Sequence, residues 1–206
     1  MWKPTPPKDY KYKKQNLADL AKTAKFIYQI GETSALRKPS KKVSIVKLSS
    51  PEYKAKFKYL KKCMQDYRRL TGKGRGIAAV QVGIPEKFFV LYVPEKKDKY
   101  HLFINPQILR VSEVSYRYPE ACMSCNSLIA NVVRPAWVEF TYLTEKGKEG
   151  LWSQKDATKK ERLYNRVVQH EIDHLEGIVN IDTVQSRDLI FESNEEYYKK
   201  AKLEKV

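Results

Sequence analysis

One helix with two histidines on the same face is the feature that most constrains the fold of this chain. Thr158 and Glu161 form a T-x-x-E capping box, a pattern in which each side chain satisfies a free backbone N–H at the start of a helix. Gly177 stands where a C′ glycine closes a helix. The sequence therefore predicts a helix over residues 159–176, which is about five turns long.

The spacing of the histidines on this helix predicts a metal site. His170 and His174 lie four residues apart, so their imidazoles stack one turn apart and can bind one ion, while Glu171 can act as base on a water that the ion holds. Periodicity places them on one face with Leu163 and Val167, and we expect that face to be buried. A buried carboxylate beside two imidazoles is costly to desolvate unless a cation compensates it.

A catalytic metal site usually has three protein ligands, and the residues alone leave two sources for the third. A thermolysin-like protease would take it from a glutamate about twenty residues downstream, where the chain has Glu192, Glu195 and Glu196. The alternative is a cysteine of the segment YPEACMSC, because a thiolate is a strong ligand that can approach from a strand packed on the helix.

Composition indicates one domain with basic tails. The chain has 206 residues, of which 42% are hydrophobic, and a net charge of +16, which suits either a lysine-rich surface or a polyanionic partner such as RNA or an acidic membrane surface. Its three cysteines cannot close a disulfide framework, so a reducing compartment is expected, and the single C-x-x-C pair is too little for a zinc ribbon. No stretch approaches the roughly 18 apolar residues of a membrane span.

Local patterns predict a mixed α+β domain. Residues 1–23 are expected to form a basic, flexible arm whose shortage of acids is typical of organelle-targeting segments. Apolar residues at helical spacing predict a helix over residues 51–70. Strands are expected at 88–93, 101–109 and 138–144, and also around Met123 and Ile129.

Three ordered motifs carry a family resemblance. The segments GRGIAAVQVG (74–83), EACMSC (120–125) and QHEIDHLEG (169–177) resemble the signature motifs of peptide deformylases, and the resemblance covers roughly residues 26–186. It implies a catalytic domain over residues 24–186, in which antiparallel β-sheets surround a central metal-binding helix, and a C-terminal helix or tail over residues 187–206.

The resemblance also implies the composition of the active site. One divalent metal ion, Fe(II) in most of the family with Zn, Ni or Co able to replace it, would be held by Cys122, His170 and His174. Glu171 would serve as general base and then general acid. The side-chain amide of Gln81 and the backbone N–H of Met123 would stabilise the oxyanion.

Further residues are assigned by the same motifs. The expected substrate-binding residues are Arg75, Gly76 and Ile77, with Gly76 letting the backbone approach the substrate closely. Glu120 and Arg134 would form a structural ion pair that braces the cysteine strand. Arg75 stands where an apolar residue is usual, so its side chain either extends outward or alters the pocket for the formylmethionine side chain. Ala121 replaces a glycine, which is tolerated if its φ is negative.

The implied activity is removal of the N-terminal formyl group from N-formylmethionyl nascent polypeptides, with release of formate. Such substrates arise in bacteria, mitochondria and plastids, and the basic arm favours an organelle matrix over a bacterial cytoplasm. The arm is also expected to contact ribosomal RNA. Two alternatives remain open: a zinc endopeptidase, which would use a C-terminal glutamate as ligand, and a non-catalytic, deformylase-like protein that binds RNA or the ribosome.

Overall fold

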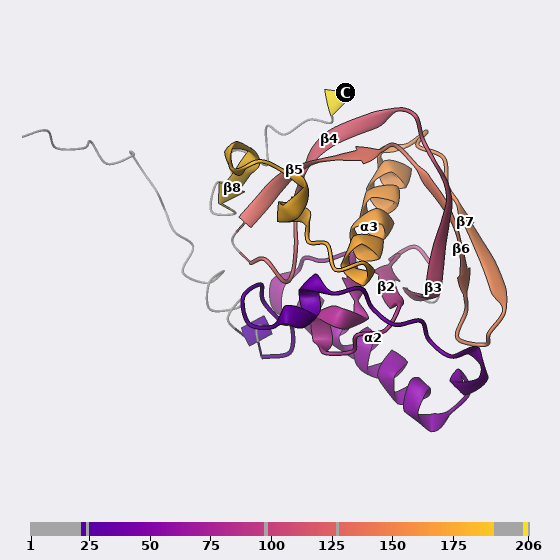
Figure 1. Cartoon of the computed structure of the whole chain (residues 1–206). Coiled ribbons are helices and arrows are strands. Elements are labelled where there is room, and N and C mark those ends of the chain that lie inside the picture. Colours follow the sequence, from indigo (N-terminus) through magenta and orange to yellow (C-terminus); the bar gives the residue numbers. More distant parts are fainter. Residues whose placement is uncertain (1–21, 24, 97–98, 127, 192–203, 206) are drawn as a thin grey trace, which may run out of the picture.

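The structure is a computed structural model that describes residues 22–23, 25–96, 99–126, 128–191 and 204–205. Two antiparallel sheets and two long helices make up its framework, as Figure 1 shows. The predicted α+β fold, with antiparallel strands around a central helix, is confirmed. Within the described residues, no helix is both long enough and apolar enough to cross a bilayer.

The larger sheet has the strand order β1-β2-β3-β6-β7. Its strands are β1 (Gly76–Ala78), β2 (Phe88–Tyr92), β3 (Tyr100–Val111), β6 (Val138–Leu143) and β7 (Glu149–Ser153). Strand β2 is buried on both faces, because Phe88 and Val90 point into one hydrophobic core while Phe89 and Leu91 point into another. This alternation lets the sheet carry one long helix on each face.

The smaller sheet has the order β8-β5-β4-β9. Its strands are β4 (Ser115–Ala121), β5 (Leu128–Pro135), β8 (Leu189–Phe191) and β9 (Glu204–Lys205). Short 3-10 helices connect the remaining segments: η1 (Ser34–Arg37), η2 (Ile45–Lys47), η3 (Ala79–Val82), η4 (Asn180–Thr183) and η5 (Ser186–Asp188). The predicted C-terminal helix is not seen at residues 189–191 and 204–205, which form strands, and residues 192–203 lie outside the described part.

Helix α2 (Pro51–Thr71) packs on one face of the larger sheet. Ser50 caps its start, since its hydroxyl accepts a hydrogen bond from the N–H of Tyr53 at 3.3 Å, and Pro51 occupies the first turn, where a missing N–H does no harm. Gly72 ends the helix with a φ of 69°. The predicted helix over 51–70 is confirmed with its end one residue later.

Helix α3 (Lys159–Leu175) lies between the two sheets and is the centre of the molecule (Figure 1). Its predicted capping box is present, because Thr158 N donates to Glu161 Oε2 at 2.8 Å and Glu161 N donates to Thr158 Oγ1 at 3.1 Å. At the other end the N–H of Gly177 donates to His174 and the N–H of Ile178 donates to Asp173, which is the Schellman pattern. The helix therefore ends one residue before the predicted boundary.

Two sequence-based expectations were wrong in detail. The segment around Met123 is not a strand, because β4 ends at Ala121 and the chain turns, with the N–H of Cys125 donating to the carbonyl of Cys122 at 3.1 Å. The face of α3 that carries Leu163 is not the core face, since Leu163 is 37% exposed. The core stripe consists instead of Tyr164, Val168, Ile172 and Leu175. The histidine face is fully buried at His174, and its earlier part, from Leu163 to Glu171, lines the cavity described below.

Candidate active site

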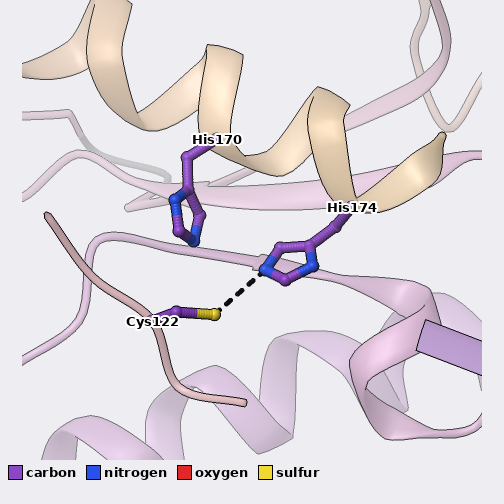
Figure 2. A group of neighbouring side chains, drawn as sticks. All are labelled: Cys122, His170 and His174. Atoms are coloured by element: carbon purple, nitrogen blue, oxygen red, sulfur yellow. Dashed lines mark hydrogen bonds between the residues drawn. The ribbon is translucent and has the colours of Figure 1, made fainter. Parts of the chain in front are cut away.

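Three potential metal ligands from distant parts of the chain meet at α3. Cys122 lies directly after β4, and Figure 2 shows both imidazoles projecting from the helix toward its sulfur. One ligand atom from each of Cys122, His170 and His174 lies within 4.8 Å of the other two. The Cys122 Sγ and His174 Nε2 atoms are 3.2 Å apart. These separations suit three ligands of one ion, whose metal–sulfur and metal–nitrogen bonds are about 2.3 Å and 2.0 Å long.

Glu120 fixes the orientation of the first histidine. His170 Nδ1 lies 3.2 Å from Glu120 Oε2. Burial alone would raise the pKa of Glu120, but the Arg134 guanidinium, the hydrogen bond from His170 and Arg166 hold it well below its usual range. An ionised carboxylate can only accept, so Nδ1 donates a proton to it, which leaves Nε2 as the nitrogen that can bind a metal once its own proton is released. The nitrogen that faces Cys122 is therefore the one able to bind a metal.

Two buried arginines hold Glu120 in place. Arg134 Nε and Nη2 donate to its two carboxylate oxygens at 2.7 and 3.0 Å, and Arg166 Nη2 donates to Oε1 at 2.6 Å. Arg134 also donates to Asp173 on α3 at 2.7 Å. The predicted pair of Glu120 and Arg134 is present, and it does more than brace a strand, because it links β4, β5 and α3 to the imidazole of His170.

His174 is held in the neutral form that a metal ligand needs. Burial lowers its pKa, and the positive charges of His170, Arg134 and Arg37 lower it further. Burial would also lower the pKa of His170, but the Cys122 sulfur and the Glu120 carboxylate raise it. The two imidazoles of one helix are thus placed in different electrostatic environments.

The turn after β4 shapes the surroundings of the Cys122 sulfur. The N–H of Ser124 donates to Sγ at 3.4 Å, and the side-chain nitrogen of Gln81 lies 3.9 Å from it. Both groups can donate to the sulfur, which acts as the acceptor. Cys125 differs, because burial and the neighbouring Cys122 raise its pKa to about 12, so its thiol stays protonated. The geometry agrees with the interpretation of Cys125 as a bystander.

Glu171 is a buried carboxylate without a fixed partner. It is 3% exposed, and its Oε2 atom has no hydrogen-bond partner among the described residues. Burial raises its pKa to about 7, although the charges of His170 and Arg134 act in the opposite direction. A carboxylate with a pKa near neutrality can both take and return a proton at physiological pH. Glu171 therefore has the properties of a general acid–base residue.

Gly76 lies directly against this carboxylate. A Cβ at position 76 would stand 2.4 Å from Glu171 Oε1 and 2.7 Å from Val167 Cγ1. The φ angle of Gly76 is not positive, so space and not backbone freedom requires a glycine. The need for a small residue at this position was predicted, and the group that a side chain would obstruct is the Glu171 carboxylate.

A cavity of about 230 Å³ joins these groups. Its floor is formed by Cys122, His170, Glu171 and Gln81, and its walls come from α3 and the loop before β1. Apolar wall residues include Tyr67, Met123, Leu163 and Val167. Leu163 is exposed because it faces this cavity and not the core. A cavity with an apolar wall and a few polar groups at one end is typical of a site for a small organic segment.

The two predicted oxyanion donors both line this cavity. Gln81 is 1% exposed. Its side-chain oxygen Oε1 accepts a hydrogen bond from the backbone N–H of Ala78 at 2.8 Å, and its side-chain nitrogen Nε2 donates to Ser124 Oγ at 3.0 Å. These bonds fix the orientation of the amide beside Cys122. The backbone N–H of Met123 has no hydrogen-bond partner in the described ranges, so it is available to a ligand.

The three predicted substrate-binding residues differ in whether they line the cavity. Gly76 and Arg75 line the cavity, and the Arg75 side chain is partly exposed. Ile77 does not line it, because alternation along β1 turns its side chain to the opposite face, into the core beneath α2. The Ile77 side chain is therefore part of the core, and its contact with substrate stays a prediction.

Two residues of the site were missed from the sequence. Arg166 lies on α3 and also donates to the backbone carbonyls of Tyr116, Tyr118 and Val132, which ties the helix to the smaller sheet. Ser124 positions Gln81. The spacing of Arg166 gave a usable signal, since it is one turn before His170 on the same helix. The glutamates of the alternative protease site, Glu192, Glu195 and Glu196, lie outside the described residues.

Comparisons with known proteins place this arrangement in a family. A family model described as polypeptide deformylase matches residues 24–189. A peptide deformylase of Prochlorococcus marinus is 31% identical over 180 residues, covering 85% of this chain and 81% of the relative. One of Rhizobium meliloti is 37% identical over 121 residues, covering 57% of this chain and 66% of the relative, so this alignment spans slightly less than two thirds of that protein. A crystal structure of a peptide deformylase from Synechococcus elongatus in complex with actinonin is similar with a TM-score of 0.65 and 28% identity, covering 84% and 86% of the two chains.

Proposed function

Because the chain belongs to the polypeptide deformylase family, we propose that it hydrolyses the N-terminal formyl group of N-formylmethionyl polypeptides and releases formate. The observation that carries this proposal is the meeting of Cys122, His170 and His174 beside the buried Glu171 in one cavity. A formyl group is small enough to enter the polar end, and the apolar wall suits a methionine side chain.

The donor set fits one divalent metal ion. Two imidazole nitrogens and a cysteine sulfur supply three ligand atoms, and a catalytic site leaves a further position open for water or substrate. When bound there, such an ion would act as a Lewis acid toward water and the formyl carbonyl. We assign the ligands to Cys122, His170 and His174. Fe(II) is the expected physiological ion, with Zn, Ni or Co able to replace it, and metal analysis of protein purified without oxygen tests this assignment.

The proton steps fall to Glu171. As a water molecule attacks the formyl carbon, its proton passes to the carboxylate, which its pKa of about 7 equips to accept it. When the carbon–nitrogen bond breaks, the same proton passes to the departing amine, and the other product is formate. The buried Oε2 atom without a partner is the group placed to hold this proton.

The negative charge that develops on the formyl oxygen needs donors already in position. Gln81 offers a side-chain N–H whose orientation is fixed by Ala78 and Ser124, and Met123 offers its backbone N–H. Because Gln81 and the Cys122 sulfur lie 3.9 Å apart, the donor is adjacent to the proposed metal ligands.

The cellular setting and the basic arm belong to the same proposal. The enzyme would work where translation begins with formylmethionine, in an organelle matrix or a bacterial cytoplasm, and the low acid content of the first residues favours an organelle. Residues 1–23 would contact ribosomal RNA through their lysines. If deletion of residues 1–20 leaves cosedimentation with ribosomes unchanged, the arm has no such role.

Formate release distinguishes this proposal from its alternatives. The metal-loaded protein should release formate from formyl-Met-Ala-Ser and leave internal bonds of N-acetylated peptides intact. Cleavage of internal bonds, with metal retained after Cys122→Ser, would instead support an endopeptidase. Salt-dependent RNA binding without formate release would support a non-catalytic relative.

A further inference from the structure

A positively charged residue, Arg75, is among those that line the proposed substrate cavity. It lies in the sequence GKGRG between α2 and β1, and it directly precedes Gly76, the residue packed against the Glu171 carboxylate. Arg75 is one of the residues that line the cavity, and its side chain is partly exposed. Consecutive Cα atoms are about 3.8 Å apart, so Arg75 lies one residue away from the glycine that contacts Glu171. A charge at this position is within reach of the first residues of a bound peptide.

The Arg75 guanidinium has no carboxylate partner in the described part of the chain. Its central carbon lies 5.9 Å from the centre of the Tyr92 ring, and Arg68 covers the same ring at 3.7 Å. The nearby carboxylate of Glu95 is already engaged, because it accepts from the Tyr164 hydroxyl at 2.8 Å and pairs with Lys160 at 3.1 Å. The guanidinium therefore keeps its capacity to bind an anion.

The other charges that line the cavity do not offset Arg75. Glu120 is enclosed by Arg134, Arg166 and His170, so its negative charge is compensated within the site. The Glu171 carboxylate packs against Gly76, next to Arg75 in the chain, and in the described part of the chain it forms no ion pair with the Arg75 guanidinium. Arg75 therefore brings a positive charge without a carboxylate partner to the lining of the cavity.

From this arrangement we infer that Arg75 selects formylated peptides that carry an acidic side chain at the second or third position. The inference rests on the proposed deformylase function and specifies the substrate class of that site. A guanidinium binds a carboxylate through two parallel N–H donors, which gives both affinity and orientation. A glutamine of the same shape as glutamate offers only one acceptor and no charge.

The test compares formyl-Met-Glu-Ala with formyl-Met-Gln-Ala, and formyl-Met-Ala-Glu with formyl-Met-Ala-Gln, all with amidated C-termini. The ratio of kcat/KM for a glutamate peptide over its glutamine partner should be roughly threefold to tenfold in the wild type in at least one pair, and should fall with added salt. Arg75→Ile and Arg75→Gln should bring the ratio to about one, while Arg75→Lys should keep part of it.

Arg110→Leu is the matched control. Arg110 is exposed on the larger sheet and pairs with Glu139 at 2.9 Å, so its loss removes one positive charge without touching the cavity. Its glutamate-to-glutamine ratio should equal that of the wild type. Dissociation constants of the same peptides on metal-loaded Glu171→Gln should show the same preference without turnover.

The outcomes separate the two proposals. Formate release from all four peptides with no preference for glutamate, or with a preference that survives Arg75→Ile, would refute the role of Arg75 and leave the deformylase intact. Absence of formate release from every peptide by the metal-loaded wild type would refute the proposed function itself.

Discussion

Substitution of Gly76 tests whether the position of the Glu171 carboxylate governs the chemistry. In Gly76→Ala the new Cβ would lie 2.4 Å from Glu171 Oε1, and the carboxylate must move back by about 1 Å to reach the 3.4 Å at which ordinary contacts begin. A displacement of this size at a catalytic group lowers the rate by about 100-fold. The crowding should also lower the free energy of unfolding by about 1–3 kcal/mol.

The assay measures kcat/KM for formyl-Met-Ala-Ser together with metal content and urea unfolding. Metal content should stay at the wild-type value, because the three atoms nearest to the added Cβ belong to Glu171 and Val167, which are not proposed ligands. Gly72→Ala is the matched control: its φ of 69° imposes backbone strain, but no atom lies within 4 Å of the added Cβ. That variant should lose stability, by about 1 kcal/mol, and keep its activity.

A double-mutant cycle refines the test. Glu171→Asp shortens the side chain by one methylene and relieves the collision with the carboxylate, although the contact with Val167 remains, so Gly76→Ala should cost less activity in the Glu171→Asp background than in the wild type. Equal losses in the two backgrounds, or full activity in Gly76→Ala alone, would refute the argument that this glycine makes room for the base.

Further predictions concern the ligands and their support. Cys122→Ser should abolish stoichiometric metal binding while Cys125→Ser leaves it unchanged, as measured by metal analysis after dialysis. Glu120→Gln should lower metal affinity by about 10- to 100-fold and stability by about 3 kcal/mol, whereas the surface variant Glu139→Gln should cost less than about 1 kcal/mol. The pKa of Glu120 lies below its usual range in the folded state, so the stability that it contributes is present above about pH 4.3 and is lost as pH falls below it. Urea titrations from pH 6 to pH 3 should show this loss of unfolding free energy in the wild type. If the free energy of unfolding falls equally steeply with pH in Glu120→Gln, the prediction is contradicted.

The helix and its site were predictable because local rules decide them. The capping box, the terminal glycine and the spacing of the histidines are encoded within twenty residues, and the structure reproduces each of them. The third ligand could not be chosen from the spacing of the histidines alone, because Cys122 follows a strand of the smaller sheet that is distant from α3 in the sequence. Only the family motifs identified it. Contacts between distant segments are the information that local patterns lack.

The errors have the same physical origin. Periodicity identified one apolar face of α3 as buried, but the helix meets a core on one side and a cavity on another, so the exposed Leu163 and the buried Ile172 carry the same apolar signal. Likewise, the apolar residues around Met123 are typical of a strand, yet hydrogen bonds to Cys122 close a turn there. Ile77 was predicted to bind substrate from its place in the first family motif, and strand geometry turns its side chain into the core.

Turnover by Glu171→Gln is the most direct test of the central claim, that this carboxylate moves the proton in metal-dependent deformylation. Wild type and variant are loaded with the same metal under anaerobic conditions, their metal content is measured, and formate release from formyl-Met-Ala-Ser is followed. Metal content should be equal, and the variant should lose at least about 100-fold in activity. Equal metal content with activity within threefold of the wild type would contradict this role of Glu171.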